Sequence, residues 1–284
     1  MILKRRPFRR VAIIGVGLMG GSLGLAIKKH KLAKEVVGIS ARRSSLVKAV
    51  KCKAVDVAYT DIDQAVKGAD LVVLATPVET IKVFLSSIKS HLKRGCVITD
   101  VGSTKFEIIE QAEKILPYPG AFIGSHPLVG SEKRGVENAS ADLYVNGLCI
   151  VTPTKKTSQV ALGKVTMLWS KIGAKVKKVS PEEHDKILTY VSHLPHLLAY
   201  GLISTISEDH LQYGSTGLKD TTRIAASSPQ MWSDICFNNS KNVVMALDQL
   251  VKKLALFRKA IMDKDERKLL EEFSNAKKKR DSIA

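Results

Sequence analysis

The sequence predicts a doubly wound parallel α/β sheet over residues 1–180, followed by an all-helical part over residues 181–284. Short apolar runs rich in Val, Ile and Leu alternate with helical patterns as far as residue 179, which indicates parallel strands joined by helices. From Pro181 onward the pattern is helical throughout. Ser180 and Pro181 have the residue types of a helix N-cap and first turn. We therefore expect a domain boundary near Ser180.

The first predicted strand and the turn after it indicate a nucleotide site. Residues 11–14 form a buried apolar run, and residues 23–27 suit a helix. In the Gly-x-Gly-x-x-Gly motif between them, Gly15 permits a tight turn and Gly17 lets the backbone approach a pyrophosphate. Gly20 lets the helix pack closely on the strand. A plain strand–helix turn is the alternative, but this order favours a Rossmann-like dinucleotide-binding domain. The expected cofactor contacts in this turn are Gly15, Gly17, Leu18, Met19 and Gly20.

The second predicted strand, over residues 35–40, bears on the choice of cofactor. A NAD-binding fold usually ends this strand with Asp or Glu, which binds the ribose hydroxyl. Here Ser40 ends it, and Arg42 and Arg43 follow. The missing carboxylate removes repulsion toward a 2′-phosphate, and either guanidinium can bind that phosphate through its planar fork. A surface loop can also carry two arginines, but the pattern favours NADP over NAD, with Ser40, Arg42 and Arg43 as contacts.

Further strands are predicted over residues 69–77, 96–105, 121–127, 148–153 and, at an edge, 175–179. Ligands bind at the carboxyl ends of parallel strands. Thr76 and Pro77 lie at one such end, and Ser103 and His126 lie at the next two. We expect Thr76, Pro77 and Ser103 to contact the cofactor, and Ser103 and His126 to be catalytic. A loop histidine with a structural hydrogen bond is the alternative reading of His126.

The helical part contains two further candidate elements. Pro195 interrupts a helical pattern between His193 and His196, and the expected bend can aim both rings. Their spacing resembles that of metal ligands, but no nearby Cys or carboxylate completes a zinc site, so we predict no metal. Arg223 follows a polar turn and begins an apolar helical stretch, where it can face a carboxylate or be a plain surface residue. Trp169 and Trp232 are expected in the core or at an interface.

Composition excludes some other classes of protein. The net charge is +18, but Lys and Arg are spread along the chain without a nucleic-acid-binding motif. Solvated surface charge explains most of it, and a positive field also helps to capture small anionic substrates. Four cysteines without paired metal spacing indicate reduced thiols. No apolar run approaches the roughly 20 residues of a membrane span, and a signal peptide fits poorly, so we expect a cytoplasmic protein.

Four stretches, together with the glycine motif, resemble the prephenate/arogenate dehydrogenases of tyrosine biosynthesis. They are residues 100–105, 125–133, 192–196 and 219–225. The resemblance runs from about Arg10 to about Asn242, and the order of the His-Pro-x-x-Gly, doubled-histidine and arginine motifs is highly specific. We expect none of the chorismate mutase or regulatory domains that some relatives carry.

The resemblance implies a reaction and roles for individual residues. The reaction is oxidative decarboxylation of prephenate or arogenate, with hydride transfer to NADP or NAD. His126 would accept a hydrogen bond from the ring hydroxyl, and Ser103 would orient His126 and the substrate. Arg223 would bind the ring carboxylate, and His196 would contact the substrate side chain.

The resemblance also implies secondary roles and an assembly. Glu132 and Asp220 would belong to an ionic network around Arg223 that gates the pocket, and His193 would support substrate binding. The helical domain of this family is its dimerisation surface, so the chain is expected to form a homodimer.

Other functions agree less well with the sequence. A β-hydroxyacid dehydrogenase or an imine-type reductase would have a lysine instead of the doubled-histidine motif. A non-catalytic NADP-binding sensor is disfavoured by the intact His126, Ser103 and Arg223. The sequence leaves open the choice between prephenate and arogenate, and whether tyrosine inhibits.

Overall fold

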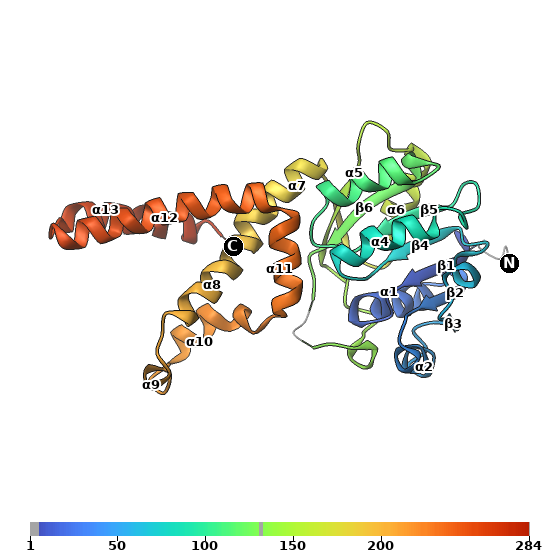
Figure 1. The fold of residues 1–284 in the computed structure, drawn as a ribbon, viewed down its shortest axis with the longest axis horizontal. Helices are drawn as coiled ribbons and strands as arrows, with labels where there is room; N and C mark the ends of the chain where they lie inside the picture. Colours follow the sequence, from blue (N-terminus) through green and yellow to red (C-terminus); the bar gives the residue numbers. More distant parts are fainter. Residues whose placement is uncertain (1–5, 131–132, 284) are drawn as a thin grey trace.

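The computed structural model describes residues 6–130 and 133–283. Within these residues, one sheet of eight strands has the order β3-β2-β1-β4-β5-β6-β7-β8. Figure 1 shows the sheet and its covering helices at one end of the molecule, with the C-terminal helices extending from it in two arms. The strands are β1 (Phe8–Ile14), β2 (Ala33–Ile39), β3 (Val57–Tyr59), β4 (Leu71–Leu74), β5 (Val97–Asp100), β6 (Phe122–Pro127), β7 (Leu148–Thr152) and β8 (Lys175–Lys178).

Two features of the sheet differ from the prediction. β7 runs antiparallel to β6, with Pro127 opposite Cys149, whereas all other neighbouring strands are parallel. The link between β6 and β7 contains a short 3-10 turn, Val136–Asn138, but no crossover helix over its described residues. The chain therefore re-enters the sheet at the end where β6 stops. β3 was not expected, because three half-buried residues leave no clear apolar pattern.

The alternation of side chains along β1 divides the core into two layers. Val11 and Ile13 pack in the cluster that includes helices α1, α2 and α6, whereas Ala12 and Ile14 pack in the cluster with α3, α4 and α5. Since successive side chains of a strand point to opposite faces, an unbroken apolar run is buried on both sides. These helices are α1 (Leu18–Lys29), α2 (Arg43–Lys51), α3 (Ile62–Val66), α4 (Val78–Ile88), α5 (Phe106–Ile115) and α6 (Gln159–Lys171).

The helical part begins as predicted. The hydroxyl oxygen of Ser180 accepts a hydrogen bond from the backbone N–H of Glu183 at 3.1 Å, which caps the first helix. α12 and α13 lie side by side as one arm, and α8, α9 and α10 form the other (Figure 1). No described helix has the length and apolar character that crossing a membrane would require. The helices are α7 (Pro181–Leu188), α8 (Leu194–Ser204), α9 (Glu208–Leu211), α10 (Thr216–Thr222), α11 (Pro229–Asn238), α12 (Ser240–Met262) and α13 (Glu266–Asp281).

The bend expected at Pro195 takes the form of a widened helical turn. Thr189–His193 is a π-helix between α7 and α8, and Pro195 lies in the first turn of α8. Proline has no N–H, and its ring clashes with the carbonyl of the preceding turn. A π turn adds backbone to that turn without breaking the helix.

The glycine turn after β1 has the predicted division of roles. Gly15 has φ +98°, and a Cβ on it would lie 2.4 Å from the carbonyl oxygen of Ala75. A Cβ on Gly20 would lie 2.0 Å from the carbonyl oxygen of Gly15, so α1 and the turn approach too closely for a side chain. A Cβ on Gly17 would meet nothing within 4 Å. Packing therefore requires Gly15 and Gly20, whereas Gly17 leaves space for a ligand.

This difference predicts that two matched substitutions change the stability by different amounts. Gly20→Ala should lower the free energy of unfolding by about 1–3 kcal/mol, because the methyl group overpacks the turn. Gly17→Ala should change it by no more than about 1 kcal/mol, the scale of losing a preferred N-cap residue. Urea unfolding of both variants without nucleotide measures this. Equal unfolding midpoints for the two variants would contradict the assigned roles.

Candidate active site

A cleft of about 470 Å³ opens at the carboxyl ends of β1, β4 and β5. The strand order reverses between β1 and β4, and such a reversal is where open α/β sheets bind their ligands. Ser227 and Ser228 belong to the opposite wall, which the helical part supplies. Six predicted contacts line the cleft: Gly17, Leu18, Met19, Thr76, Pro77 and Ser103.

The residues predicted to choose the cofactor lie at the end of β2. The backbone N–H of Arg42 donates to the hydroxyl oxygen of Ser40 at 3.2 Å, and α2 begins at Arg43. Both arginines are exposed. None of these three residues lines the 470 Å³ cleft, but β2 is the direct neighbour of β1.

His126 is half-buried near the end of β6, and its ring is held by a residue that the sequence analysis missed. The Nδ1 atom of His126 lies 2.9 Å from the Nε2 atom of His184, which is a wholly buried residue of α7. Among the described residues, no hydrogen bond joins Ser103 to His126. The observed partner of the ring therefore comes from the helical part and not from the Ser103 loop.

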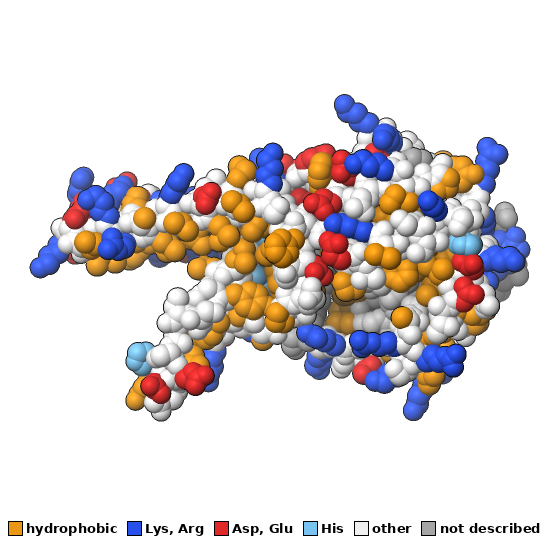
Figure 2. Space-filling view, in the orientation of Figure 1, with side chains coloured by type: hydrophobic (Ala, Val, Ile, Leu, Met, Phe, Trp, Pro, Cys, Tyr) orange, Lys and Arg blue, Asp and Glu red, His pale blue; other side chains and the backbone are white. Residues whose placement is uncertain are grey.

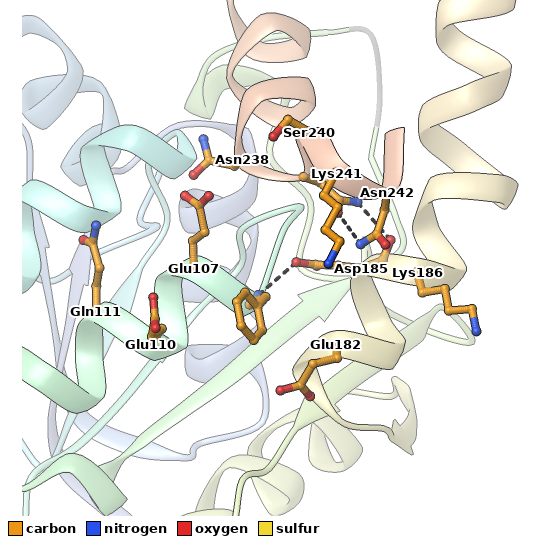
Figure 3. A pocket seen from close by; sticks show the side chains of 12 residues that line it. Glu107, Glu110, Gln111, Glu182, Asp185, Lys186, Asn238, Ser240, Lys241 and Asn242 are labelled. Carbon is orange, nitrogen blue, oxygen red and sulfur yellow. Dashed lines mark hydrogen bonds between the residues drawn. The ribbon is translucent and has the colours of Figure 1, made fainter. Parts of the chain in front are cut away.

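The carboxylate of Asp185 holds His184 in turn. Its Oδ1 atom lies 2.7 Å from Nδ1 of His184. The same oxygen accepts a hydrogen bond from the backbone N–H of Lys105 at 2.8 Å, and Oδ2 accepts one from Phe106 at 2.9 Å. Figure 3 shows Asp185 reaching from α7 toward the first residues of α5, beside a cavity of about 530 Å³. Asp185 thus satisfies free donors at the start of α5 while it orients His184.

These contacts determine which nitrogen carries the proton in the rings of His184 and His126. Burial raises the pKa of the Asp185 carboxyl, whereas the backbone N–H groups of Phe106 and Lys105, which donate to its two oxygens, act to lower it. An ionised carboxylate only accepts hydrogen bonds, so with Asp185 ionised Nδ1 of His184 carries that ring's proton. Burial, with the charge of Lys105, lowers the pKa of His184 to about 2, so its Nε2 is unprotonated and accepts from Nδ1–H of His126. Burial, with His184 and Lys105, also holds the pKa of His126 well below its usual 6.5. His126 is therefore neutral, and its Nε2 keeps a lone pair for an incoming proton.

A buried ion pair fixes the strand ends beside this ring. The ammonium of Lys105 contacts the carboxylate of Asp100 and donates to the carbonyl oxygen of Ser125 at 3.0 Å. Asp100 also accepts from the backbone N–H groups of Ser125 at 3.0 Å and Gly102 at 2.9 Å. The ion pair therefore ties β5 to the residue that precedes His126.

The doubled-histidine motif forms an aromatic cluster with Trp232. The ring of His196 stacks on the ring of Trp232, with 3.5 Å between the ring centroids. The ring of His193 meets the indole edge-on, with 6.0 Å between the centroids. Asn239 donates to Nδ1 of His193 at 3.2 Å, and Nδ1 of His196 donates to the carbonyl oxygen of Ser192 at 2.9 Å. Trp232 was expected to be a core or interface residue. It is buried as expected, but it also packs against both candidate histidines.

Two buried nitrogen atoms of this cluster are unpaired among the described residues: Nε2 of His193 and Nε1 of Trp232. The indole N–H of Trp232 is a donor, and Nε2 of His193 is a donor when Nδ1 of that ring accepts from Asn239. Burial lowers the pKa of His193 to about 4, so the ring is neutral. The cluster can therefore donate hydrogen bonds to an acceptor group of a ligand.

Arg223 is exposed at the start of a 3-10 turn, Arg223–Ala226, that packs against α8. Burial lowers the pKa of His196, and the positive charge of Arg223 lowers it further. Asp220 is exposed on α10, and no ion pair to Arg223 is found in the described part of the chain. Glu132 lies outside the described residues. The turn that begins at Arg223 continues into the cleft wall at Ser227.

The chain matches two family models, described as "Prephenate dehydrogenase, nucleotide-binding domain" over residues 23–178 and "Prephenate dehydrogenase, dimerization domain" over residues 180–275. It is 35% identical to the prephenate dehydrogenase of Bacillus subtilis over 96% of this chain and 76% of that protein. It is 33% identical to the cyclohexadienyl dehydrogenase of Zymomonas mobilis over 96% of this chain and 95% of that protein.

A solved structure has the same fold throughout. The prephenate dehydrogenase of Aquifex aeolicus, in complex with hydroxyphenyl propionate and NAD⁺, matches with a TM-score of 0.92 and 33% identity over the whole of both chains. The two family models together span residues 23–178 and 180–275, and the solved structure matches the fold over the whole chain. The chain belongs to the prephenate dehydrogenase family.

Proposed function

We propose that this chain catalyses the oxidative decarboxylation of prephenate to 4-hydroxyphenylpyruvate, of arogenate to tyrosine, or of both, in tyrosine biosynthesis. Its family is one of dehydrogenases, and the Aquifex relative was solved with NAD⁺. The observation that carries the proposal is the hydrogen bond between Nδ1 of His126 and His184, which leaves Nε2 of the neutral ring as its proton acceptor. We propose the same domain division as the sequence predicts, with residues 1–180 binding the cofactor and 181–284 binding substrate and a second subunit.

The residues of the cleft fit a dinucleotide. Gly17 leaves open space at the start of α1, where free backbone N–H groups can bind a pyrophosphate. Leu18, Met19, Thr76 and Pro77 line the same cleft, and Ser103 reaches it from the end of β5. When bound, the nicotinamide supplies the acceptor for the hydride. The exposed Arg42 and Arg43, with Ser40 in place of a carboxylate, support NADP over NAD.

The chain's own residues then accept and return one proton while the substrate loses its ring carboxylate. As hydride leaves the carbinol carbon, His126 Nε2 takes the hydroxyl proton. The electron pair of the bond to the departing carbon dioxide enters the ring, which becomes aromatic, and the phenolic oxygen recovers the proton. Because aromatisation makes this step favourable, orientation is the main task of the protein. Ser103, which lines the cleft, is proposed to orient the substrate, whereas His126 is held by His184.

The helical part is proposed to hold the substrate. Arg223 is assigned to the ring carboxylate, since a guanidinium can pair with both oxygens at once. His196, stacked on Trp232, is assigned to the substrate side chain, and the unpaired N–H of His193 supports it. Asp220 and Glu132 remain proposed members of an ionic network around Arg223.

A homodimer is proposed from the helical arms. Figure 2 shows hydrophobic side chains gathered along the α12–α13 arm, on the side that faces the α8–α10 arm. A contiguous exposed apolar surface marks an interaction site. The family model that matches this part of the chain is a dimerization domain. The exposed apolar residues of this arm include Val244, Met245, Val251, Leu254, Leu270 and Phe273.

A cytoplasmic location is proposed because all four cysteines are free thiols.

Replacement of His126 by Asn tests the proposed base. We expect kcat with prephenate or arogenate to fall by roughly two to four orders of magnitude, with KM little changed, because Asn cannot take the proton. The low pKa of His126 means that wild-type kcat/KM stays level as the pH falls past 6.5 and drops only at more acid pH, where the ring gains a proton. Steady-state pH profiles should show this acid limb in the wild type and not in His126→Asn. Near-normal turnover with an unchanged profile would remove His126 from this role.

The cofactor preference is tested with the double variant Arg42→Ala/Arg43→Ala. We expect the wild type to have a higher kcat/KM with NADP than with NAD. The ratio should fall by about tenfold or more in the variant, equivalent to about 1.4 kcal/mol. Lys51→Ala, at the other end of α2, removes a similar exposed charge and should leave the ratio unchanged. A wild type that prefers NAD tenfold would contradict the assignment.

Arg223→Ala should act mainly on substrate binding. Arg223 is exposed in the free chain, and its proposed pair with the ring carboxylate is buried only when the substrate covers it. Loss of one partner from such a covered pair costs about 2–5 kcal/mol, so KM for the substrate should rise well over tenfold. Lysine should restore only part of the affinity, because a point charge cannot form the paired contact. Lys219→Ala, exposed on α10, is the charge-matched control and should behave as the wild type. A weaker KM for the cofactor with a normal substrate KM would show that Arg223 has another role.

A further inference from the structure

We propose that Asp185 and His184 form a positioning pair that keeps the proton of His126 on Nδ1 and so leaves Nε2 able to accept the substrate's proton. This inference rests on the proposed function of His126. It assigns the pair a role that neither residue was given from the sequence. The pair acts through His126 and is not itself expected to touch the substrate.

The hydrogen bonds that link Asp185, His184 and His126 all run in one direction. Backbone N–H groups of Lys105 and Phe106 donate to the Asp185 carboxylate at 2.8 and 2.9 Å. The carboxylate can then only accept from His184, at 2.7 Å, and His184 can only accept from His126, at 2.9 Å. Each bond fixes the direction of the next, and the last one decides which nitrogen of His126 is free.

The opposite tautomers of the two rings would leave His126 unable to accept the substrate's proton. If His184 carried its proton on Nε2, Nδ1 of His126 would have to accept, and the proton of His126 would move to Nε2. That nitrogen would then face a substrate hydroxyl as a donor and could not take its proton. Asp185 prevents this, because an ionised carboxylate beside Nδ1 of His184 stabilises only the productive arrangement.

Asp185 and His184 are held in place by groups at the start of α5 and at the start of α12. Asp185 and His184 are 1% and 0% exposed, so neither can exchange its partners for water. Asn239, at the start of α12, donates from its Nδ2 to the backbone carbonyl of Asp185 at 2.9 Å and to the hydroxyl oxygen of Thr189 at 2.8 Å. The carboxylate itself reaches α5 (Figure 3). His126 of the sheet is therefore oriented by groups whose positions are set by α5, α7 and α12 together.

A purely structural role for Asp185, as a cap of α5, is the competing explanation. It predicts lower stability when Asp185 is changed, but no change in the position of the proton on His126. The two explanations are separated by a measurement that reads the tautomer directly. Long-range proton–nitrogen correlation spectra of protein labelled with ¹⁵N-histidine distinguish protonated from unprotonated ring nitrogens, and His126→Asn identifies the signals of His126 among the seven histidines.

The main test is Asp185→Asn. An amide placed toward Nδ1 of His184 donates where the carboxylate accepted, so it should reverse both tautomers. We expect the His126 proton to move from Nδ1 to Nε2. We also expect kcat to fall by up to about 10⁴-fold, the loss in a serine protease triad when the aspartate becomes asparagine, with KM for the substrate within about threefold. A variant with the wild-type tautomer and kcat within about threefold of the wild type would overturn the proposal.

Two controls keep the result interpretable. Ser180→Ala removes the cap of the same helix, α7, without touching the pair. It should lower the melting temperature but leave the tautomer and kcat within about twofold of the wild type. If Asp185→Asn does not fold, His184→Gln and His184→Leu decide the matter. Gln can still accept from His126 and donate to Asp185, so it should retain at least tenfold more activity than Leu. Equal activity of the two variants, at any level, would overturn the proposal.

Failure of the proposed function would look different. A wild type without dehydrogenase activity on prephenate or arogenate would refute that function, while the spectra would still report whether Asp185 sets the tautomer of His126. An active wild type whose activity depends on His126 but is indifferent to Asp185→Asn would refute the positioning pair alone.

Discussion

The ammonium of Lys105 and the carboxylate of Asp100 form an ion pair that is wholly removed from water. Burying two charges is costly, and such a pair persists only when further hydrogen bonds satisfy its remaining donors and acceptors. Here the backbone of Ser125 supplies one donor and one acceptor, and Gly102 supplies another donor. The ends of β5 and β6, which carry Ser103 and His126, are therefore fixed relative to each other by groups that have no alternative partner in water.

The same buried charge has an electrostatic consequence. A cation behind the imidazoles opposes their protonation, so Lys105 adds to burial in lowering the pKa values of His126 and His184. A general base needs this condition, because a protonated ring cannot accept another proton. One interaction thus both aligns the strand ends and keeps the ring beside them neutral.

The parts of the fold that the sequence predicts are those set by local pattern. β1 and the turn at Gly15 follow from a continuous apolar run and three spaced glycines, and the start of α7 follows from Ser180 and Pro181. The direction of β7 could not be predicted, because it depends on how the 128–147 link returns to the sheet. β3 is too short to produce a periodic signal.

The site divides in the same way. Ser103 and Gly17, which line the cleft, could be predicted as site candidates because the strand ends of a parallel sheet are ligand sites. His184 and Asp185 were missed, although a His-Asp pair at a predicted helix start was visible in the sequence. Their partners lie 58 and 80 residues away, at His126 and Lys105, and only the packing of α7 against the sheet brings them together. The roles of Arg223, Asp220 and Glu132 still rest on resemblance.

The π turn Thr189–His193 sets the rotational phase between the two histidine-bearing helices, α7 and α8. An α-helix turns about 100° per residue, whereas a π turn spreads its rotation over more residues. If the same five residues were wound as a regular α-helix, each would turn further, and His196 would be rotated by about a quarter turn relative to His184. The angular relation between the ring that contacts His126 and the ring stacked on Trp232 is therefore set by the winding of one turn. Rewinding of this segment would separate the two halves of the site even if every side chain were kept.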